Sequence, residues 1–444
     1  MRIKRTIAAF IAAMLALISL PVAFSAAALS TTETEYPTPE GYDDHDYQAA
    51  VAFLTAENEA GVKNYETLDA LSSTLTYDPA DPTTWGKIIL EEPSYVLFNG
   101  IIWTEEPVKR LRGLWIEIEG DFPHGTFPLY GSIDFSNCSA LTNFVLTNAD
   151  HLDSINLTGC SALRSYCTSR TGITSADFSG CTSLMAIDCT YEDVTYINIP
   201  DSPLLEQIQC CGTLITNIDV SNCPDLTFLN AADCKLSSLD VSNCHELEML
   251  WCEYNDLTSL SVEGLTKLNN LHCNDNRIAS LNINGCTELM DIYCQNNCLT
   301  ELDFTSVTYP YFKTVRAEGS GFVGYRCGLY VGLDRAIAEP KAGAEFLGWY
   351  AEDGSLISNE TELLKNATDQ TVITARFTEV AAVPGDIDND GSVTANDALM
   401  VMRYSLGLIS SLPMTAAADV DGNGSVTAND ALLIMRAALG LVSL

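Results

Sequence analysis

The sequence predicts an α+β multidomain protein in three parts: a short solenoid of stacked repeats, a small β-rich module, and an all-α end with two loop-helix units. Three observations predict this fold class. A 21-residue pattern recurs through the middle of the chain. Short segments rich in aromatic and β-branched residues follow it, and two near-identical acidic stretches lie 33 residues apart near the end.

Residues 1–28 have the pattern of a secretory signal peptide. Arg2, Lys4 and Arg5 precede an apolar run at Ile7–Leu20, and small residues continue to Ala28. The run is too short to span a membrane, and no later segment is long and apolar enough, so we expect a secreted, soluble chain without membrane insertion. Without this peptide, 19 Lys and Arg face 59 Asp and Glu, a net charge of −40. That charge excludes nucleic acid as a partner.

Residues 44–133 are expected to form an N-terminal cap region. A solenoid must cover its first open face, and this segment, which contains three tryptophans, has a suitable length and composition. The alternative is a small catalytic domain, although about 90 residues is short for a polysaccharide-cleaving fold. The predicted elements are a helix at Asp46–Glu59 and strands at Tyr95–Trp103 and Arg112–Ile118.

Residues 134–307 are predicted to form the solenoid. Seven 21-residue units run from Ser161 to Val307 after a 22-residue unit at Ser139–Cys160. In each 21-residue unit the third residue is Leu, and the sixth is Tyr, Ile or Leu. One unit cannot bury its own apolar face, so neighbouring units must stack and share a core. With its L-x-x-L-x-C-x-x-N-x-L core, clearest in Thr266–Cys286, the pattern resembles a short bacterial leucine-rich repeat of the internalin-like kind.

Two side-chain columns follow from this register. Most cysteines recur at the eighth or the last position of a unit, where both columns should point inward and a free thiol packs as a small hydrophobe. We expect a ladder of free thiols, with disulfides or a metal site as the alternative, because strand-adjacent geometry suits disulfides poorly. At the eleventh position, Asn255, Asn276 and Asn297 should bond backbone groups after the strand, with Cys234 in the same column.

The seventh residue of each unit should project from the concave sheet. That column contains Trp251, His272 and Tyr293, and Tyr254 lies at the tenth position beside Trp251. These four residues form a candidate ligand surface for a sugar or a protein. The alternative interpretation is cross-strand aromatic stacking that only stabilises the sheet.

Residues 308–378 are predicted to form the β-rich module, followed by a linker at 379–384. The pairing of F-x-G-W-Y with a later T-A-R-F resembles the small β repeat that follows leucine-rich repeats in internalin-type surface proteins. That resemblance implies a spacer or adhesion function. The predicted strands are Thr314–Ala317, Gly328–Val331, Glu345–Tyr350 and Thr371–Phe377.

The two acidic stretches, Asp386–Asp397 and Asp419–Asp430, have the spacing of calcium loops. Oxygen-bearing side chains occupy positions 1, 3, 5, 9 and 12, and glycine occupies position 6. The spacing predicts two calcium ions, one in each loop. The candidate ligands of the first ion are Asp386, Asp388, Asp390, the Ser392 carbonyl, Thr394 and Asp397; those of the second are Asp419, Asp421, Asn423, the Ser425 carbonyl, Thr427 and Asp430.

Each loop is followed by one predicted amphipathic helix, at Ala398–Leu406 and Ala431–Leu439. This paired loop-helix unit, at residues 385–444, resembles a dockerin module of type I-like kind, the part by which cellulosome subunits attach to cohesin domains of a scaffoldin. The resemblance implies cohesin contacts at loop positions 10 and 11 and at a basic helix residue. These are Ala395, Asn396 and Arg403 in the first half, and Ala428, Asn429 and Arg436 in the second. Because the halves match, either could dock after a 180° turn.

No catalytic motif was found: the five histidines are scattered, and the sequence has no HExxH, zinc-type spacing or GxSxG. We therefore expect a secreted, non-catalytic cellulosome-type component. Its dockerin-like end would attach to a cohesin, placing the chain at the cellulosome or cell surface, and its repeats would recognise a protein or carbohydrate. Two alternatives remain: a polysaccharide-degrading or protease-modulating enzyme subunit with an unrecognised N-terminal domain, and an adhesin.

Overall fold

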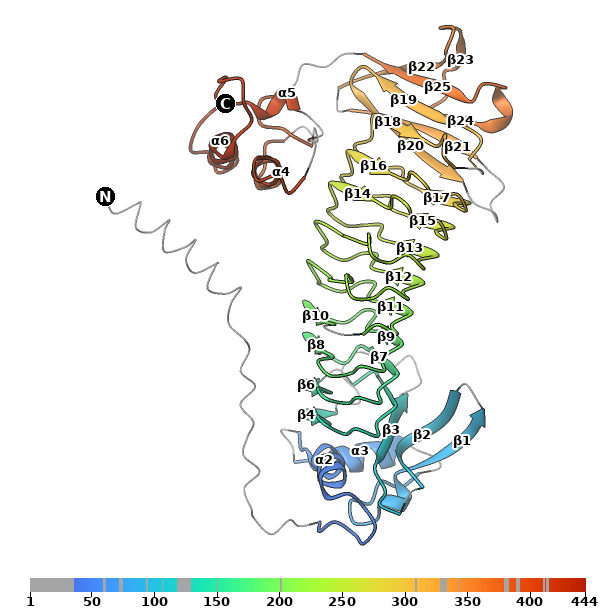
Figure 1. Cartoon of the computed structure of the whole chain (residues 1–444). Coiled ribbons are helices and arrows are strands. Elements are labelled where there is room, and N and C mark those ends of the chain that lie inside the picture. Colours follow the sequence, from blue (N-terminus) through green and yellow to red (C-terminus); the bar gives the residue numbers. More distant parts are fainter. Residues whose placement is uncertain are drawn as a thin grey trace. The chain divides into compact units, whose positions relative to one another are not determined.

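The computed structural model describes residues 36–444 except 59–60, 72–74, 93–94, 106, 118–128, 150, 200–201, 308–309, 328–333, 342, 379–382, 389–391, 410–411 and 413–414. The predicted signal peptide at 1–28 lies outside these residues. Residues Thr38–Leu444 belong to one unit by their internal contacts. Among the described residues, 14 strands form one sheet that extends from the N-terminal region through the repeats into the β-rich module (Figure 1).

The N-terminal region continues the sheet of the repeats. Its strand β3 pairs antiparallel with β2 and parallel with β5, the first strand of the repeats on this sheet. The buried Asp46 carboxylate connects this region to β3, because it accepts hydrogen bonds from Arg110 Nε and from Leu111 N, both at 2.8 Å. The elements are α2 (Asp44–Thr55), α3 (Asn64–Leu71), η1 (Pro82–Thr84), β1 (Gly86–Glu92), β2 (Tyr95–Trp103) and β3 (Leu111–Glu117).

Helix α2 begins two residues before the predicted start and ends at Thr55. The start follows from Asp43, whose carboxylate accepts a hydrogen bond from Asp46 N and caps the helix. On the buried face of α2, the ring of Tyr47 stacks on that of Trp85, with centroids 5.5 Å apart. The predicted strand at Tyr95–Trp103 is confirmed as β2, and the one at Arg112–Ile118 is shifted by one residue in β3.

The repeats stack as predicted, with the strands of successive units following one another in chain order (Figure 1). Equivalent residues pair in parallel register, so that Leu250, Leu271 and Ile292 lie side by side and are all fully buried. The strands of the main sheet are β5 (Asn143–Thr147), β7 (Ser165–Ser169), β9 (Ala186–Asp188), β11 (Gln207–Gln209), β12 (Phe228–Asn230), β13 (Met249–Trp251), β15 (Asn270–His272) and β17 (Asp291–Tyr293). The other edge carries β4 (Tyr130–Asp134), β6 (His151–Asn156), β8 (Ser175–Asp177), β10 (Tyr196–Asn198), β14 (Ser259–Ser261), β16 (Ser280–Asn282) and β18 (Glu301–Asp303).

The predicted asparagine contacts are confirmed at the turn after the strand. Asn276 Nδ2 donates to the carbonyls of Cys252 and Cys273 at 2.9 and 3.2 Å, and its Oδ1 accepts from Leu257 N at 3.0 Å. Asn255 and Asn297 make the equivalent bonds. The eleventh side chain thus ties each turn to its own repeat and to the one before.

The cysteines form the predicted ladder of free thiols. All sixteen are free in the structure, and most are buried. Thiols at the last position donate to carbonyls of the preceding repeat, as Cys160 does to Phe135 at 3.0 Å and Cys286 to Val262 at 3.1 Å. These two thiols therefore fill small core positions and also pair with backbone acceptors.

The β-rich module continues directly from the last repeat. Strand β20 pairs antiparallel with β17, and β19 pairs antiparallel with β18. The strand predicted at Gly328–Val331 lies outside the described residues. The described elements are β19 (Thr314–Glu318), β20 (Gly321–Cys327), β21 (Arg335–Pro340), β22 (Phe346–Ala351), β23 (Leu356–Ser358), β24 (Glu362–Leu364), η2 (Lys365–Ala367) and β25 (Val372–Phe377).

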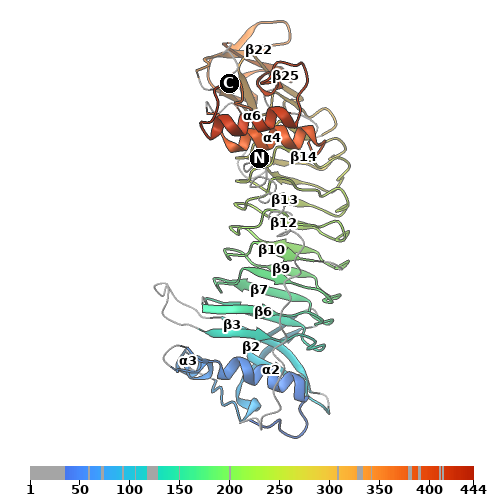
Figure 2. The same ribbon diagram turned by 90° about the vertical axis from the view of Figure 1, so that its left-hand side faces the viewer.

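The C-terminal part contains α4 (Ala395–Ser405), α5 (Thr415–Ala418) and α6 (Ala428–Ala438). Helices α4 and α6 lie side by side (Figure 2). Their inner faces join Ile387 in a small buried core that includes Val401 and Ile434. The predicted helix starts at Ala398 and Ala431 were three residues too late in each half. Among the helices of the described residues, none has the length and hydropathy needed to span a bilayer.

Candidate functional site

The first acidic loop brings three of its predicted ligands together. One carboxylate oxygen each from Asp386, Asp388 and Asp397 lies within 4.8 Å of the others. All three side chains are buried or nearly so. Asp390, also predicted as a ligand, lies outside the described residues, whereas Ser392 is described and exposed.

The second loop repeats this arrangement with Asp419, Asp421 and Asp430, whose oxygens also lie within 4.8 Å of one another. Gly424, at loop position 6, has a φ of 87°, which a residue with a side chain rarely adopts. Its N–H donates to Asp419 Oδ2 at 2.7 Å, and Asn423 Oδ1 accepts from Ser425 N at 2.9 Å. The glycine therefore allows the chain to curl around the cluster of oxygens.

The last aspartate of each loop has a second role that the sequence analysis missed. Asp397 Oδ2 accepts from the backbone and hydroxyl of Thr394, at 2.8 and 2.9 Å, which makes a capping box at the start of α4. Asp430 and Thr427 do the same for α6. The T-x-x-D pattern in the sequence could have predicted both capping boxes. Loop and helix overlap by three residues, which explains the late predicted helix starts.

The same aspartates also hold the beginning of each loop. Asp397 Oδ1 accepts from Ile387 N at 2.6 Å, and Asp430 Oδ1 accepts from Val420 N at 3.1 Å. Burial alone would raise the pKa of Asp430, but the hydrogen bonds from Thr427 and Asp421 bring that pKa below its usual value. The hydroxyls of Thr394 and Thr427 act as N-caps, accepting from Asn396 N and Asn429 N. Position 9 of such loops often reaches the ion through water.

This donor set fits calcium. Three carboxylates that converge within 4.8 Å repel one another unless a cation lies between them. All the described candidate ligands are oxygen atoms, the donors that hard cations such as Ca²⁺ take. A third cluster of potential metal ligands, His45, Asp46 and Cys138, is different, because Asp46 is already paired with Arg110.

The predicted partner-binding residues lie at or near the surface of the helical pair. Ala395, Asn396, Ala428 and Asn429 are exposed, as is Arg436, whereas Arg403 is half-buried. The structure adds exposed leucines that the sequence analysis missed. They occupy equivalent places in the two halves: Leu399 and Leu432 are 46% and 52% exposed, and Leu406 and Leu439 are 63% and 65% exposed. Each pair lies at the same sequence distance from its own loop, and this repetition could have predicted an exposed role for these leucines.

The aromatic residues predicted as a ligand surface pack against one another. The rings of Trp251 and His272 stack with centroids 5.5 Å apart and 7° between their planes. His272 meets Tyr293 edge to face, and Arg326 lies 4.7 Å over the Tyr293 ring. The neighbours therefore cover part of each ring, and all three side chains are half-buried. Tyr254 differs, because 58% of its surface is exposed.

Buried polar atoms without hydrogen-bond partners lie on β15, on β17 and on the adjacent β20. Among the described residues they include His272 Nε2, Asp291 Oδ1 and Arg326 Nε. His272 Nε2 lies 3.7 Å from Asp291 Oδ1. Burial, assisted by the nearby Arg326, lowers the pKa of His272 to about 4, so its ring is neutral at pH 7. All three atoms are buried, so they lie out of reach of a ligand in this structure.

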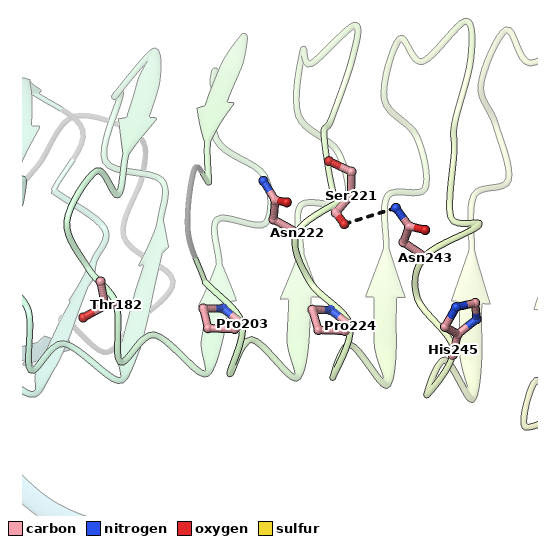
Figure 3. A pocket seen from close by; sticks show the side chains of 7 residues that line it. All are labelled: Thr182, Pro203, Ser221, Asn222, Pro224, Asn243 and His245. Atoms are coloured by element: carbon pink, nitrogen blue, oxygen red, sulfur yellow. Dashed lines mark hydrogen bonds between the residues drawn. The ribbon is translucent and has the colours of Figure 1, made fainter.

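A shallow pocket lies elsewhere on the repeats, between successive loops rather than on the strands (Figure 3). Asn243 Nδ2 donates to the Ser221 carbonyl across it at 3.3 Å. The pocket has no titratable group besides His245. It is lined by Thr182, Pro203, Ser221, Asn222, Pro224, Asn243 and His245.

Comparison with known proteins identifies the C-terminal part. Residues 384–439 match the family model of the dockerin type I domain. No curated protein matches the chain. The recognised domain is therefore the region with the paired loops, α4 and α6.

Among solved structures, the chain is similar to an internalin (InlF) of Listeria monocytogenes, with 16% identity and a TM-score of 0.24, covering 40% of this chain and 66% of that one. It is similar to the leucine-rich repeat domain of APL1B, with 15% identity and a TM-score of 0.29, covering 40% and 60%. A third, the functional domain of InlJ from Listeria monocytogenes, which includes a cysteine ladder, has 15% identity and a TM-score of 0.23, covering 56% and 80%. Scores this low carry no argument; the repeat fold is read from the stacked strands themselves.

Proposed function

We propose, from the type I dockerin domain at residues 384–439, that this chain is a secreted, non-catalytic component of a cellulosome-type assembly. The dockerin domain binds a cohesin of a scaffoldin, and the leucine-rich repeats present a recognition surface. The observation that carries the proposal is the duplicated site. Each half has three converging carboxylates, and an Asn and an Arg at equivalent places in its sequence.

Calcium acts structurally in this proposal. One ion in each loop neutralises the carboxylates and so holds the start of α4 or α6 against its loop. The residues themselves position the helices, because Asp397 and Asp430 bond both the loop and the helix N-terminus. A correctly folded pair then presents Asn396, Asn429 and the exposed leucines to the partner.

The test is a titration of the full chain with purified type I cohesins by calorimetry, in calcium and in chelator. We expect binding in calcium and a loss of at least about 100-fold in chelator, since the metal supplies folding free energy. A double variant, Asp386→Ala with Asp419→Ala, should lose binding in calcium. The matched control removes two charges from exposed turns of the β-rich module, Asp353→Ala with Asp369→Ala, and should bind normally. Equal affinity with and without calcium would contradict the proposal.

The recognition surface is proposed at Trp251, His272, Tyr293 and Tyr254, with a carbohydrate or a protein as ligand. The support is the exposed ring of Tyr254, which lies three residues after Trp251. Affinity electrophoresis in gels containing soluble β-glucan or xylan tests whether the ligand is a carbohydrate. Tyr254→Ala should abolish retardation while leaving the melting temperature unchanged, and the equally exposed Tyr191→Ala is the control. Whether the ligand is a protein is tested by placing a cross-linker at position 254 and identifying the protein that it captures.

The proposal that the chain is not an enzyme rests on its sequence, in which no catalytic motif was found. Reducing-sugar and protease assays on the full chain test it directly. Secretion is proposed from the N-terminal pattern at residues 1–28. It predicts that the mature chain is found outside the cell, held by its cohesin.

A further inference from the structure

The two halves of the dockerin domain differ in their surroundings, although their expected contact residues are identical. Asp386 and Asp388 are 2% and 9% exposed, whereas Asp421, the equivalent of Asp388, is exposed. Arg403 on α4 is half-buried, and Arg436 on α6 is exposed. Unequal burial of equivalent residues indicates that a part of the chain outside the domain contacts the first half.

Arg277 of the repeats makes the main contact. It lies at position 12 of the unit Thr266–Cys286, and its Nη1 donates to Asp388 Oδ2 at 2.8 Å. With the Asn396 amide turned so that its oxygen faces the guanidinium, that oxygen accepts from Nη1 and Nη2 of Arg277 at 3.1 and 3.0 Å. Asp256, 3.4 Å from Arg277 Nε, helps to hold the guanidinium in place. A rigid planar group thus bridges the first loop and the start of α4.

A second contact comes from the other direction. Arg403 Nη1 donates to the carbonyl of Ser237, two repeats before Arg277, at 3.4 Å. Within the described residues, no hydrogen bond or ion pair given by the structure joins the second half to the repeats. Both polar residues expected to contact a cohesin in the first half, Asn396 and Arg403, are therefore used within the chain. Among the described residues, the side chains of their counterparts, Asn429 and Arg436, make no hydrogen bond or ion pair with a repeat in the structure.

We propose that the repeats engage Asn396 and Arg403 of the first of the two equivalent cohesin-binding faces, so that a cohesin is bound through the second half. The inference rests on the proposed function and gives the attachment one orientation where the sequence offers two. A cohesin approaching the first half must first displace Arg277 and the Ser237 carbonyl. Asp388 can serve the loop as well, because its carboxylate has two oxygens and Arg277 uses Oδ2.

The experiment compares matched double variants of the full chain in calcium, titrated with a type I cohesin that binds the parent chain. Asn429→Ala with Arg436→Ala should weaken binding at least about 30-fold, the loss typical of truncating a charged interface contact. Asn396→Ala with Arg403→Ala should change affinity by less than about twofold. When Arg277→Glu is added to either double variant, both should bind with similar affinity. Equal losses from the two double variants without Arg277→Glu would overturn the inference.

A second measurement needs no cohesin. Small-angle X-ray scattering of the chain with Arg277→Glu should give a larger radius of gyration than the parent chain, because the dockerin domain is released from the repeats. Lys267→Glu is the control, since Lys267 lies in the same repeat and, among the described residues, its ion pair is with Glu246 of the preceding repeat. An unchanged radius in Arg277→Glu would refute the contact. If no cohesin binds the parent chain, the proposed function fails, and this scattering result still decides whether the face is covered.

Discussion

Replacing Asn276 with alanine should lower the free energy of unfolding of the repeats by about 3 kcal/mol. The side chain is 9% exposed, accepts one bond from Leu257 N, and donates to the carbonyls of Cys252 and Cys273. Alanine leaves the N–H of the fully buried Leu257 without this acceptor and takes a donor from each carbonyl. Each buried group left unsatisfied costs about 1–3 kcal/mol, so the N–H and one carbonyl together account for the figure.

The assay is urea unfolding of the full chain in calcium, followed by tryptophan fluorescence, to which Trp251 in the preceding repeat contributes. The control is Asn269→Ala in the same repeat, whose amide makes one long bond of 3.5 Å to the Lys267 carbonyl. That variant should cost less than about 0.5 kcal/mol. Equal costs for the two variants would refute the reasoning, because they would mean that the turn holds without its asparagine.

Three further predictions concern charge, the loop turn and the metal. Burial raises the pKa of Glu339 to about 7, so its contribution to stability is full below pH 4.5 and is lost as the pH rises through 7. Glu339→Gln should therefore raise the urea midpoint at pH 8 far more than at pH 5, and equal gains at both would contradict this. Gly424→Ala, at a φ of 87°, should weaken calcium binding about fivefold by straining the turn. Gly264→Ala, at a φ of 78° in open space, should leave calcium affinity unchanged. Chelation should reduce the helical circular dichroism at 222 nm and leave the melting of the repeats in place; an unchanged spectrum would count against metal-dependent folding.

Periodic features were predictable because a repeated unit shows its register many times. The leucines at the third position, the asparagine contacts and the buried cysteines all follow from that register. The ligand positions of the two loops were readable for a similar reason, since each loop is local and occurs twice. The paired carboxylate clusters then follow from the spacing alone.

Long-range contacts were not predictable, because no pattern in the sequence connects their partners. Asp46 and Arg110 lie 64 residues apart, and Arg277 and Asp388 lie 111 residues apart. The orientation of the Trp251 ring was also hidden, since the rings on neighbouring strands decide which face is covered. The predicted helix starts were wrong for a different reason. Asp397 belongs both to the loop pattern and to the capping box of α4, and the loop pattern was the more conspicuous.

The pairing of β25 has a mechanical consequence. The chain leaves this strand at Phe377 toward the dockerin domain, and β25 lies parallel to β19 with five residue pairs in register, from Thr314 with Val372 to Glu318 with Arg376. A pull on the anchor along β25 therefore loads this ladder in shear, so that its hydrogen bonds resist together rather than opening one at a time. An assembly under tension between scaffold and bound ligand would be held by a clamp of this kind at the point where the force enters the protein.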